Sequence, residues 1–159
     1  MSKKHNLYLG KAGQFVIMSE LLCRGWNVAI PEVDVGDDIF VVRDINGDLI
    51  RVQVKTASGR LLANQAVQAQ FNINIQQLKT ISPPLLVYAF VIRFADTWQK
   101  PILIRQNLLN ELYQLNNIGS SSGNQLFLRI TVKDNLVSCG NINLSEYLNS
   151  FQDFPIILH

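Results

Sequence analysis

The clearest pattern in the sequence is the alternation of apolar and polar residues on both sides of Asn46-Gly47. Residues 38–44 read DIFVVRD and residues 49–57 read LIRVQVKTA. Alternation with a period of two is typical of a strand that turns one face to the core. Asn-Gly is the strongest short signal for a two-residue hairpin turn. The sequence therefore predicts a β-hairpin built from these two segments.

Helical and extended segments share the rest of the chain. Residues 10–24 read as a helix that stops at Gly25, because glycine is common just past a helix C-terminus. The apolar run 85–93 has the length of a strand buried on both faces. The other expected elements are an extended segment at 26–31, a polar loop with a weak helix at 59–70, a helix at 75–80 capped by Asn74, a break at Ser82-Pro83-Pro84, a strand at 101–105, a helix at 107–115, a flexible loop at 118–124, a hairpin from 126–132 and 136–139, and a short helix capped by Ser145. This order predicts one mixed α/β or α+β domain over residues 1–159.

The predicted turn also predicts which side chains meet across the hairpin. With Asn46-Gly47 as a two-residue turn, Asp38 lies opposite Lys55 and diagonal to Gln53. Opposed side chains are roughly 5 Å apart at Cβ and diagonal ones roughly 7–8 Å. The other face of the ribbon carries aliphatic side chains and belongs to the core. A slip by one residue would bury the charges, so the pattern itself supports this assignment of faces.

The Asp38–Lys55 pair has two interpretations. It is either an ion pair on a solvated face, which contributes little to stability, or part of a site. Three further carboxylates, Glu32, Asp34 and Asp37, precede it in PEVDVGDD. Oxygen ligands hold hard cations such as Mg²⁺, and a lysine beside the metal can orient water or offset negative charge. Converging carboxylates beside one lysine favour metal-dependent hydrolysis of a phosphodiester.

Composition and charge set limits on the partners. The chain has 159 residues, of which 48% are hydrophobic and 16% charged, which suits a domain with a sizeable core. The net charge is +2, so a nucleic-acid-binding protein of this kind must gather its cations on one side. Cys23 and Cys139 are far apart without histidines at ligand spacing, which speaks against zinc or a disulfide scaffold. The apolar run 85–92 is too short to cross a bilayer, and no apolar segment follows the first lysines. We therefore expect no membrane association and a cytoplasmic location.

One long stretch resembles a known family. It reads GKAGQFVIMSELLCRGWNVAIPEVDVGDDIFVVRDINGDLIRVQVKTAS. A helix after glycines, an Arg-Gly-Trp corner, a proline, an aspartate at the start of a hairpin and a Gln-x-Lys strand follow in the order seen in the PD-(D/E)XK nuclease superfamily. That superfamily includes restriction endonucleases, Holliday junction resolvases and a cyanobacterial intron-homing endonuclease. The resemblance covers residues 10–58 well and the later strands and helix more loosely.

The resemblance implies a fold and a site. The fold is a restriction-endonuclease-like α/β/α core with a central mixed sheet and a helix on each side. Asp38, Gln53 and the main-chain carbonyl of Val54 are the implied ligands of Mg²⁺ or Mn²⁺, and Lys55 is the implied catalytic lysine. Gln14 is a further implied catalytic residue, second in line as a ligand of the metal or of water, and stands where branches of the family place a glutamate. Gln53 stands where the family has Glu or Asp. Two charges are thereby lost, and Asp34 or Asp37 are candidates to compensate.

The implied partner is DNA. A nuclease of this size must reach both strands of a duplex, so a homo-oligomer, either a dimer or a tetramer, is expected from the resemblance. Lys11, Arg51 and Arg60 are candidates for phosphate contacts, although the basic start of the chain can equally be a solvated terminus. The alternative function is a DNA-binding or partner-binding module that keeps the nuclease fold without turnover, because the two glutamines weaken the charge of the site.

Overall fold

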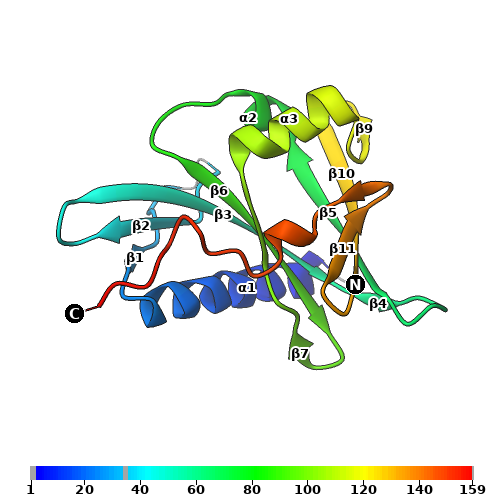
Figure 1. Cartoon of the computed structure of the whole chain (residues 1–159), viewed down its shortest axis with the longest axis horizontal. Coiled ribbons are helices and arrows are strands. Elements are labelled where there is room, and N and C mark those ends of the chain that lie inside the picture. The colour runs from blue at the N-terminus through cyan, green and yellow to red at the C-terminus, as the bar shows by residue number, and fades with distance from the viewer. Residues whose placement is uncertain (1–2, 34–35, 159) are drawn as a thin grey trace.

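Two six-stranded β-sheets form the framework of the protein (Figure 1). The computed structural model describes residues 3–33 and 36–158. The first sheet contains β1 (Asn27–Ala29), β2 (Ile39–Arg43), β3 (Asp48–Ser58), β6 (Leu86–Phe94), β7 (Thr97–Trp98) and β8 (Ile102–Arg105). The second contains β4 (Arg60–Leu61), β5 (Val67–Asn74), β9 (Ser120–Ser122), β10 (Gln125–Lys133), β11 (Leu136–Cys139) and β12 (Ile142–Asn143). Four helical segments complete the chain: α1 (Lys3–Cys23), α2 (Ile75–Lys79), α3 (Gln106–Asn116) and the 3₁₀ turn η1 (Ser145–Tyr147).

The first sheet is mixed, as predicted. Strand β6 lies at its centre, parallel to β3 and antiparallel to β7 and β8, whereas β1, β2 and β3 are antiparallel neighbours. All side chains of β6 from Leu86 to Ile92 are buried, which confirms a strand covered on both faces.

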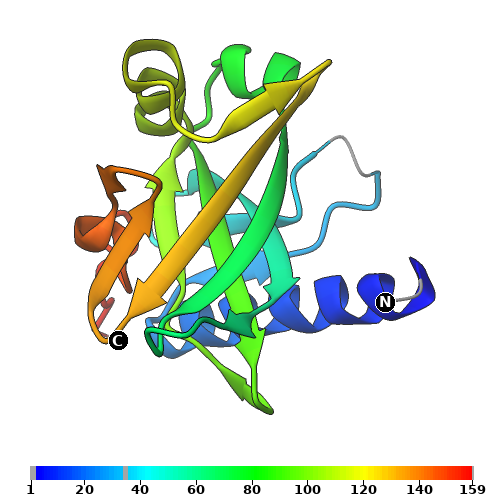
Figure 2. The same cartoon turned by 90° about the vertical axis from the view of Figure 1, so that its right-hand side faces the viewer.

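Helix α1 covers one face of the first sheet. Its Ile17 and Leu21 pack in one core cluster with Ile39, Val41 and Val52. The opposite face packs against the second sheet, and Figures 1 and 2 show α2 and α3 at one end of that layer. The predicted mixed α/β fold with flanking helices is confirmed. Much of the layer that covers the second face is nevertheless strand.

Two segments predicted as loops contain strands. The polar segment 59–70 includes β4 and the start of β5, and the loop 118–124 includes β9. In β5 the sequence VQAQFNIN alternates buried and accessible positions, so its amide side chains occupy the outer face of a strand. The high polarity of this segment made its strand-like alternation, with a period of two, difficult to recognise from sequence.

The boundaries of the helices follow their caps. Helix α1 begins at Lys3, seven residues before the predicted start, and ends before Gly25, whose φ of 86° and N–H bond to the Leu22 carbonyl close the helix. Asn74 caps α2 by accepting a bond from the N–H of Gln77, as predicted. Ser145 instead binds the main chain of Val137, and Leu144 precedes the 3₁₀ turn. No helix among the described residues is long and apolar enough to span a bilayer.

The predicted hairpin register is wrong by two residues. Ile39 pairs with Val52 rather than Val54, because the connection contains four residues, 44–47, instead of two. A type I′ turn needs positive φ at both central residues, but Gly47 has φ of 73° and Asn46 has no positive φ. A shift by two preserves the period of the strand, so every side chain keeps its predicted face.

Candidate functional site

Asp38 lies at the open end of the hairpin, where β2 begins. Its N–H donates to the Val52 carbonyl over 2.9 Å, and its carboxylate Oδ2 accepts a 2.7 Å bond from the N–H of Val54. The pairing of β2 with β3 ends at Ile39 and Val52, and Asp38 bonds to the main chain of Val52 and Val54, so the predicted direct opposition to Lys55 is wrong. The Asp38 carboxylate is bound to the N–H of Val54, which lies between Gln53 and Lys55. Asp38, Gln53 and Lys55 therefore lie at the same end of the hairpin.

The backbone of Val54 faces Asp38. The N–H of Arg51 donates to the Leu85 carbonyl over 2.8 Å, and in a parallel pair alternate residues bond to the same neighbour. Odd-numbered residues of β3 therefore turn their polar backbone groups to β6, whereas Val54 turns its N–H and carbonyl to the opposite edge. Since β2 pairs with β3 only as far as Ile39 and Val52, the Val54 carbonyl points to the side where Asp38 lies.

Gln53 is a buried amide on the face that turns away from α1. Its side chain is 7% exposed, and its Oε1 is buried without a hydrogen-bond partner among the described residues. The register between β3 and β6 places it beside Tyr88, whose hydroxyl is also buried and without a partner in that part of the chain. Burial and the nearby Asp37 carboxylate raise the pKa of Tyr88. A buried acceptor without a donor is costly, and a cation is one way to satisfy it.

Lys55 lines a cleft of about 580 Å³. The cleft lies between the first turns of α1, the end of β3 and the neighbouring strand β5, with Asn6, Gln70 and Asn72 among its lining residues. Lys55 is half-buried. A ligand in this cleft would lie between the start of α1 and the second sheet, beside Lys55.

Gln14 reaches the site from α1, but through its nitrogen. Its Nε2 donates to the main-chain carbonyl of Asp38 over 2.5 Å, and its Oε1 accepts a 2.8 Å bond from Lys11 Nζ. Lys11 and Gln14 are three residues apart and thus neighbours on the helix surface. Gln14 supports the position of Asp38 in this arrangement and does not present its oxygen as a ligand.

A glycine lets α1 approach the site. A Cβ at Gly13 would lie 2.0 Å from Thr56 Oγ1, far inside van der Waals contact. Only glycine allows this separation of α1 and β3, and the separation brings Gln14 within reach of Asp38. The sequence pattern did not predict this role of Gly13. A glycine inside a helix is nevertheless a signal of close packing.

The predicted DNA-contacting arginines have different surroundings. Arg51 lies on the same side of β3 as Lys55, but its Nη2 donates 2.7 Å bonds to the carbonyls of Ser82 and Pro84. Its Nη1 lies 3.5 Å from the buried Asp37 carboxylate. Arg51 thus connects β3 to two loops. Arg60 is exposed on β4 and donates a 2.6 Å bond to Gln68 Oε1.

The negative charge of the site comes mainly from Asp38. Asp37 is paired with Arg51, Glu32 is exposed, and Asp34 lies outside the described residues. Among residues 3–33 and 36–158, no three His, Cys, Asp or Glu side chains form a metal-binding group. A metal at Asp38 would depend on one carboxylate and on neutral oxygens. Gln53 Oε1 fits such a role because it is buried and lacks a donor.

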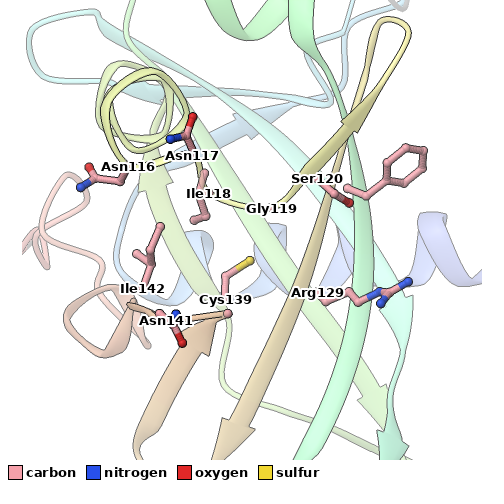
Figure 3. A pocket seen from close by; sticks show the side chains of 11 residues that line it. Asn116, Asn117, Ile118, Gly119, Ser120, Arg129, Cys139, Asn141 and Ile142 are labelled. Atoms are coloured by element: carbon pink, nitrogen blue, oxygen red, sulfur yellow. The ribbon is translucent and has the colours of Figure 1, made fainter.

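A second cavity, of about 310 Å³, lies beside the end of α3 and is lined by residues of β10 and β11 (Figure 3). Ile118, Gly119, Arg129, Cys139 and Ile142 are among the residues that line it. Burial raises the pKa of the Cys139 thiol, partly offset by hydrogen bonds from the backbone of Arg129 and Gly119. The thiol is therefore protonated at neutral pH, and the cavity contains none of the predicted site residues.

The chain is similar to known proteins at the level of its fold. No protein family model matches the sequence, and no curated protein is similar enough to match. Among solved structures, the bacterial homing endonuclease I-Ssp6803I superposes with a TM-score of 0.52 over 95% of this chain and 89% of its own, at 17% identity. The two proteins share a fold, and the likeness extends across nearly the whole chain.

Proposed function

We propose that this protein is a metal-dependent DNA endonuclease of the PD-(D/E)XK type. The observation that carries the proposal is the hydrogen bond from the Val54 N–H to Asp38 Oδ2, 2.7 Å long. It joins the aspartate that starts the hairpin to the Gln53-Val54-Lys55 segment, the association that the resemblance to that superfamily implies. The fold shared with a homing endonuclease supports the same reading.

The proposed ligands are one carboxylate and two neutral oxygens. Asp38 supplies the charge, Gln53 supplies a buried amide oxygen, and Val54 supplies a backbone carbonyl directed to the same edge. Mg²⁺ or Mn²⁺, when bound, would acidify water and offset the charge of the phosphate.

The remaining residues would position the reactants. The Lys55 ammonium would donate a hydrogen bond to the attacking water or to a phosphate oxygen in the adjoining cleft. The water oxygen would bond to phosphorus as the opposite P–O bond breaks in line, with the water proton passing to solvent and the departing oxygen taking a proton from solvent. Gln14 would hold the Asp38 main chain through its amide nitrogen, with Lys11 orienting that amide. Because a duplex has two strands to cut, we further propose that the protein acts as a homo-oligomer.

One observation favours a second function, a DNA-binding module of nuclease fold without turnover. Both Gln14 and Gln53 are neutral, and Gln14 turns its nitrogen rather than its oxygen to Asp38. A site with a single carboxylate holds a divalent cation weakly. This alternative predicts DNA binding that is independent of added metal.

The test is nicking of supercoiled plasmid and of branched DNA in Mg²⁺ or Mn²⁺, compared with nicking in EDTA. Metal-dependent nicking by the native chain that is lost in Lys55→Ala and kept in Lys100→Ala supports the endonuclease. Lys100 is an exposed lysine between β7 and β8, so it controls for charge. DNA binding without nicking at any metal concentration would favour the second function.

A further inference from the structure

The outer face of the second sheet is mostly polar. In β5 and β10 the residues that face the core are aliphatic or aromatic, and the alternate residues are accessible. We call the outward set the polar sheet face; by the registers of β4, β5, β9, β10 and β11 it consists of Arg60, Gln68, Gln70, Asn72, Asn74, Ser120, Ser122, Gln125, Phe127, Arg129, Thr131, Lys133, Leu136 and Ser138.

The polar sheet face carries cations and no carboxylate. Arg60, Arg129 and Lys133 are its charged members, although the whole chain has 12 acidic residues and a net charge of only +2. A nucleic-acid-binding surface on a nearly neutral protein requires this segregation of charge.

The side chains of the face are held in place by one another. Arg129 Nε donates to Gln70 Oε1 over 3.1 Å, and Figure 3 shows the Arg129 side chain extending from β10 toward β5. Gln68 Nε2 donates to Thr131 Oγ1 over 3.1 Å, and Gln68 Oε1 accepts a 2.6 Å bond from Arg60. Side chains already ordered before binding lose less entropy when they bind.

The face adjoins the candidate active site. Gln70 and Asn72, which are exposed on β5, also line the cleft that contains Lys55. A polymer whose backbone enters that cleft would therefore pass over the second sheet. The cleft and the polar sheet face are therefore continuous.

We infer that the polar sheet face reads base edges in the major groove of duplex DNA, an inference that rests on the proposed endonuclease function. A two-stranded β-ribbon fits the major groove, where Asn and Gln pair with adenine, Arg pairs with guanine, and an apolar group such as Phe127 contacts the thymine methyl. The five residues from Gln68 to Asn72 span roughly 14 Å, about four base-pair steps. The central readers are Gln70, Asn72 and Arg129.

The test uses a pool of duplexes with random central sequence, selected by the native chain in EDTA so that no strand is cut. We expect enrichment of a sequence motif. In Gln70→Ala or Asn72→Ala the preference at one or a few adjacent positions disappears, and affinity for the selected duplex falls about 5- to 150-fold. Affinity for a shuffled duplex changes far less. Gln114→Ala, which removes an exposed amide from α3, and Lys100→Ala keep the native motif and affinity.

Each other outcome overturns either the inference or the function beneath it. If Gln70→Ala, Asn72→Ala and Arg129→Ala, with unchanged thermal midpoints, all select the native motif at native affinity, the face does not read DNA. The proposed endonuclease function would still stand in that case, provided that Lys55→Ala abolishes nicking. Preference for single strands or RNA of the same sequence, or no enriched motif, also refutes the inference. Failure of metal-dependent nicking refutes the endonuclease separately.

Discussion

The Asp38 carboxylate accepts a 2.7 Å hydrogen bond from the main-chain N–H of Val54. The bond replaces a ladder contact that β2 would otherwise make, since β2 pairs with β3 only from Ile39 onward. It has a structural role and places the carboxylate beside the Val54 carbonyl. Variants at Asp38 can separate the two roles.

Asp38→Asn should keep the structure and lose the chemistry. Asparagine retains an oxygen for the Val54 N–H, so the free energy of unfolding in EDTA should fall by less than about 1 kcal/mol. Asp38→Ala leaves that N–H without an acceptor and should cost about 1–3 kcal/mol. Both should abolish metal-dependent nicking. Chemical denaturation and plasmid nicking provide the two measurements, and nicking by Asp38→Asn at the native rate would exclude Asp38 as the essential ligand.

Gln14→Glu should tighten metal binding and weaken the metal-free protein. A carboxylate cannot donate to the Asp38 carbonyl as Nε2 does. The free energy of unfolding in EDTA should therefore fall by about 1–3 kcal/mol. Added Mn²⁺ should restore more stability than it does in the native chain, as followed by thermal melting. Gln114→Glu places the same charge on exposed α3 and should change neither value. An unchanged Mn²⁺ titration would remove Gln14 from the site.

Two glycines of α1 should respond in opposite directions to alanine. Gly13→Ala forces a Cβ to within 2.0 Å of Thr56 Oγ1 and should cost about 1–3 kcal/mol of stability. It should also reduce nicking, because α1 carries Gln14. Gly10 has no atom within 4 Å of the same position, so Gly10→Ala should stabilise the helix by about 0.5–1 kcal/mol. Equal responses in chemical denaturation would contradict the close approach of α1 and β3.

Substitutions of Arg51 and of Arg60 should differ in their effects on the stability of the protein and on DNA binding. Arg51→Ala removes two carbonyl contacts and leaves the buried Asp37 without its cation, which should cost about 2–4 kcal/mol of unfolding free energy. Asp37→Asn should recover part of the loss. Arg60→Ala should leave stability within about 0.5 kcal/mol and lower the salt dependence of DNA binding by about one phosphate contact. A large salt effect in Arg51→Ala alone would restore it as the DNA contact.

Tyr88→Phe should remove part of the loss of stability in alkali. Burial raises the pKa of Tyr88, so the hydroxyl stays protonated in the folded protein while an unfolded tyrosine ionises near pH 10. Its contribution to stability is complete below about pH 10 and is lost as the pH rises further. The variant should show a shallower fall in unfolding free energy between pH 9 and pH 11, and no loss at pH 7, because the hydroxyl has no partner among the described residues. Parallel pH profiles would show that Tyr88 is ionised or exposed.

Local patterns were most informative where one residue type decides one conformation. Gly25 ends α1, Asn74 caps α2, and the apolar run 85–93 becomes the central strand β6. The prediction of a loop at 59–70 was wrong. Glutamines at alternate positions resemble a polar loop, and the strand becomes evident only from the pairing of β5 with β10. A strand in the second sheet is defined by a partner about 60 residues away, which no local window contains.

The sequence by itself determined the faces of the hairpin, since a period of two places Gln53 and Lys55 on one side whatever the register. Only the tertiary structure decided that Asp38 bonds to Val52 and Val54, because the turn has four residues and Asn46 does not adopt the positive φ that a two-residue turn needs. It also decided that Gln14 offers its nitrogen, since Gly13 and Thr56 set the distance between α1 and β3. Long-range packing selects these contacts, and residue spacing along the chain does not specify them.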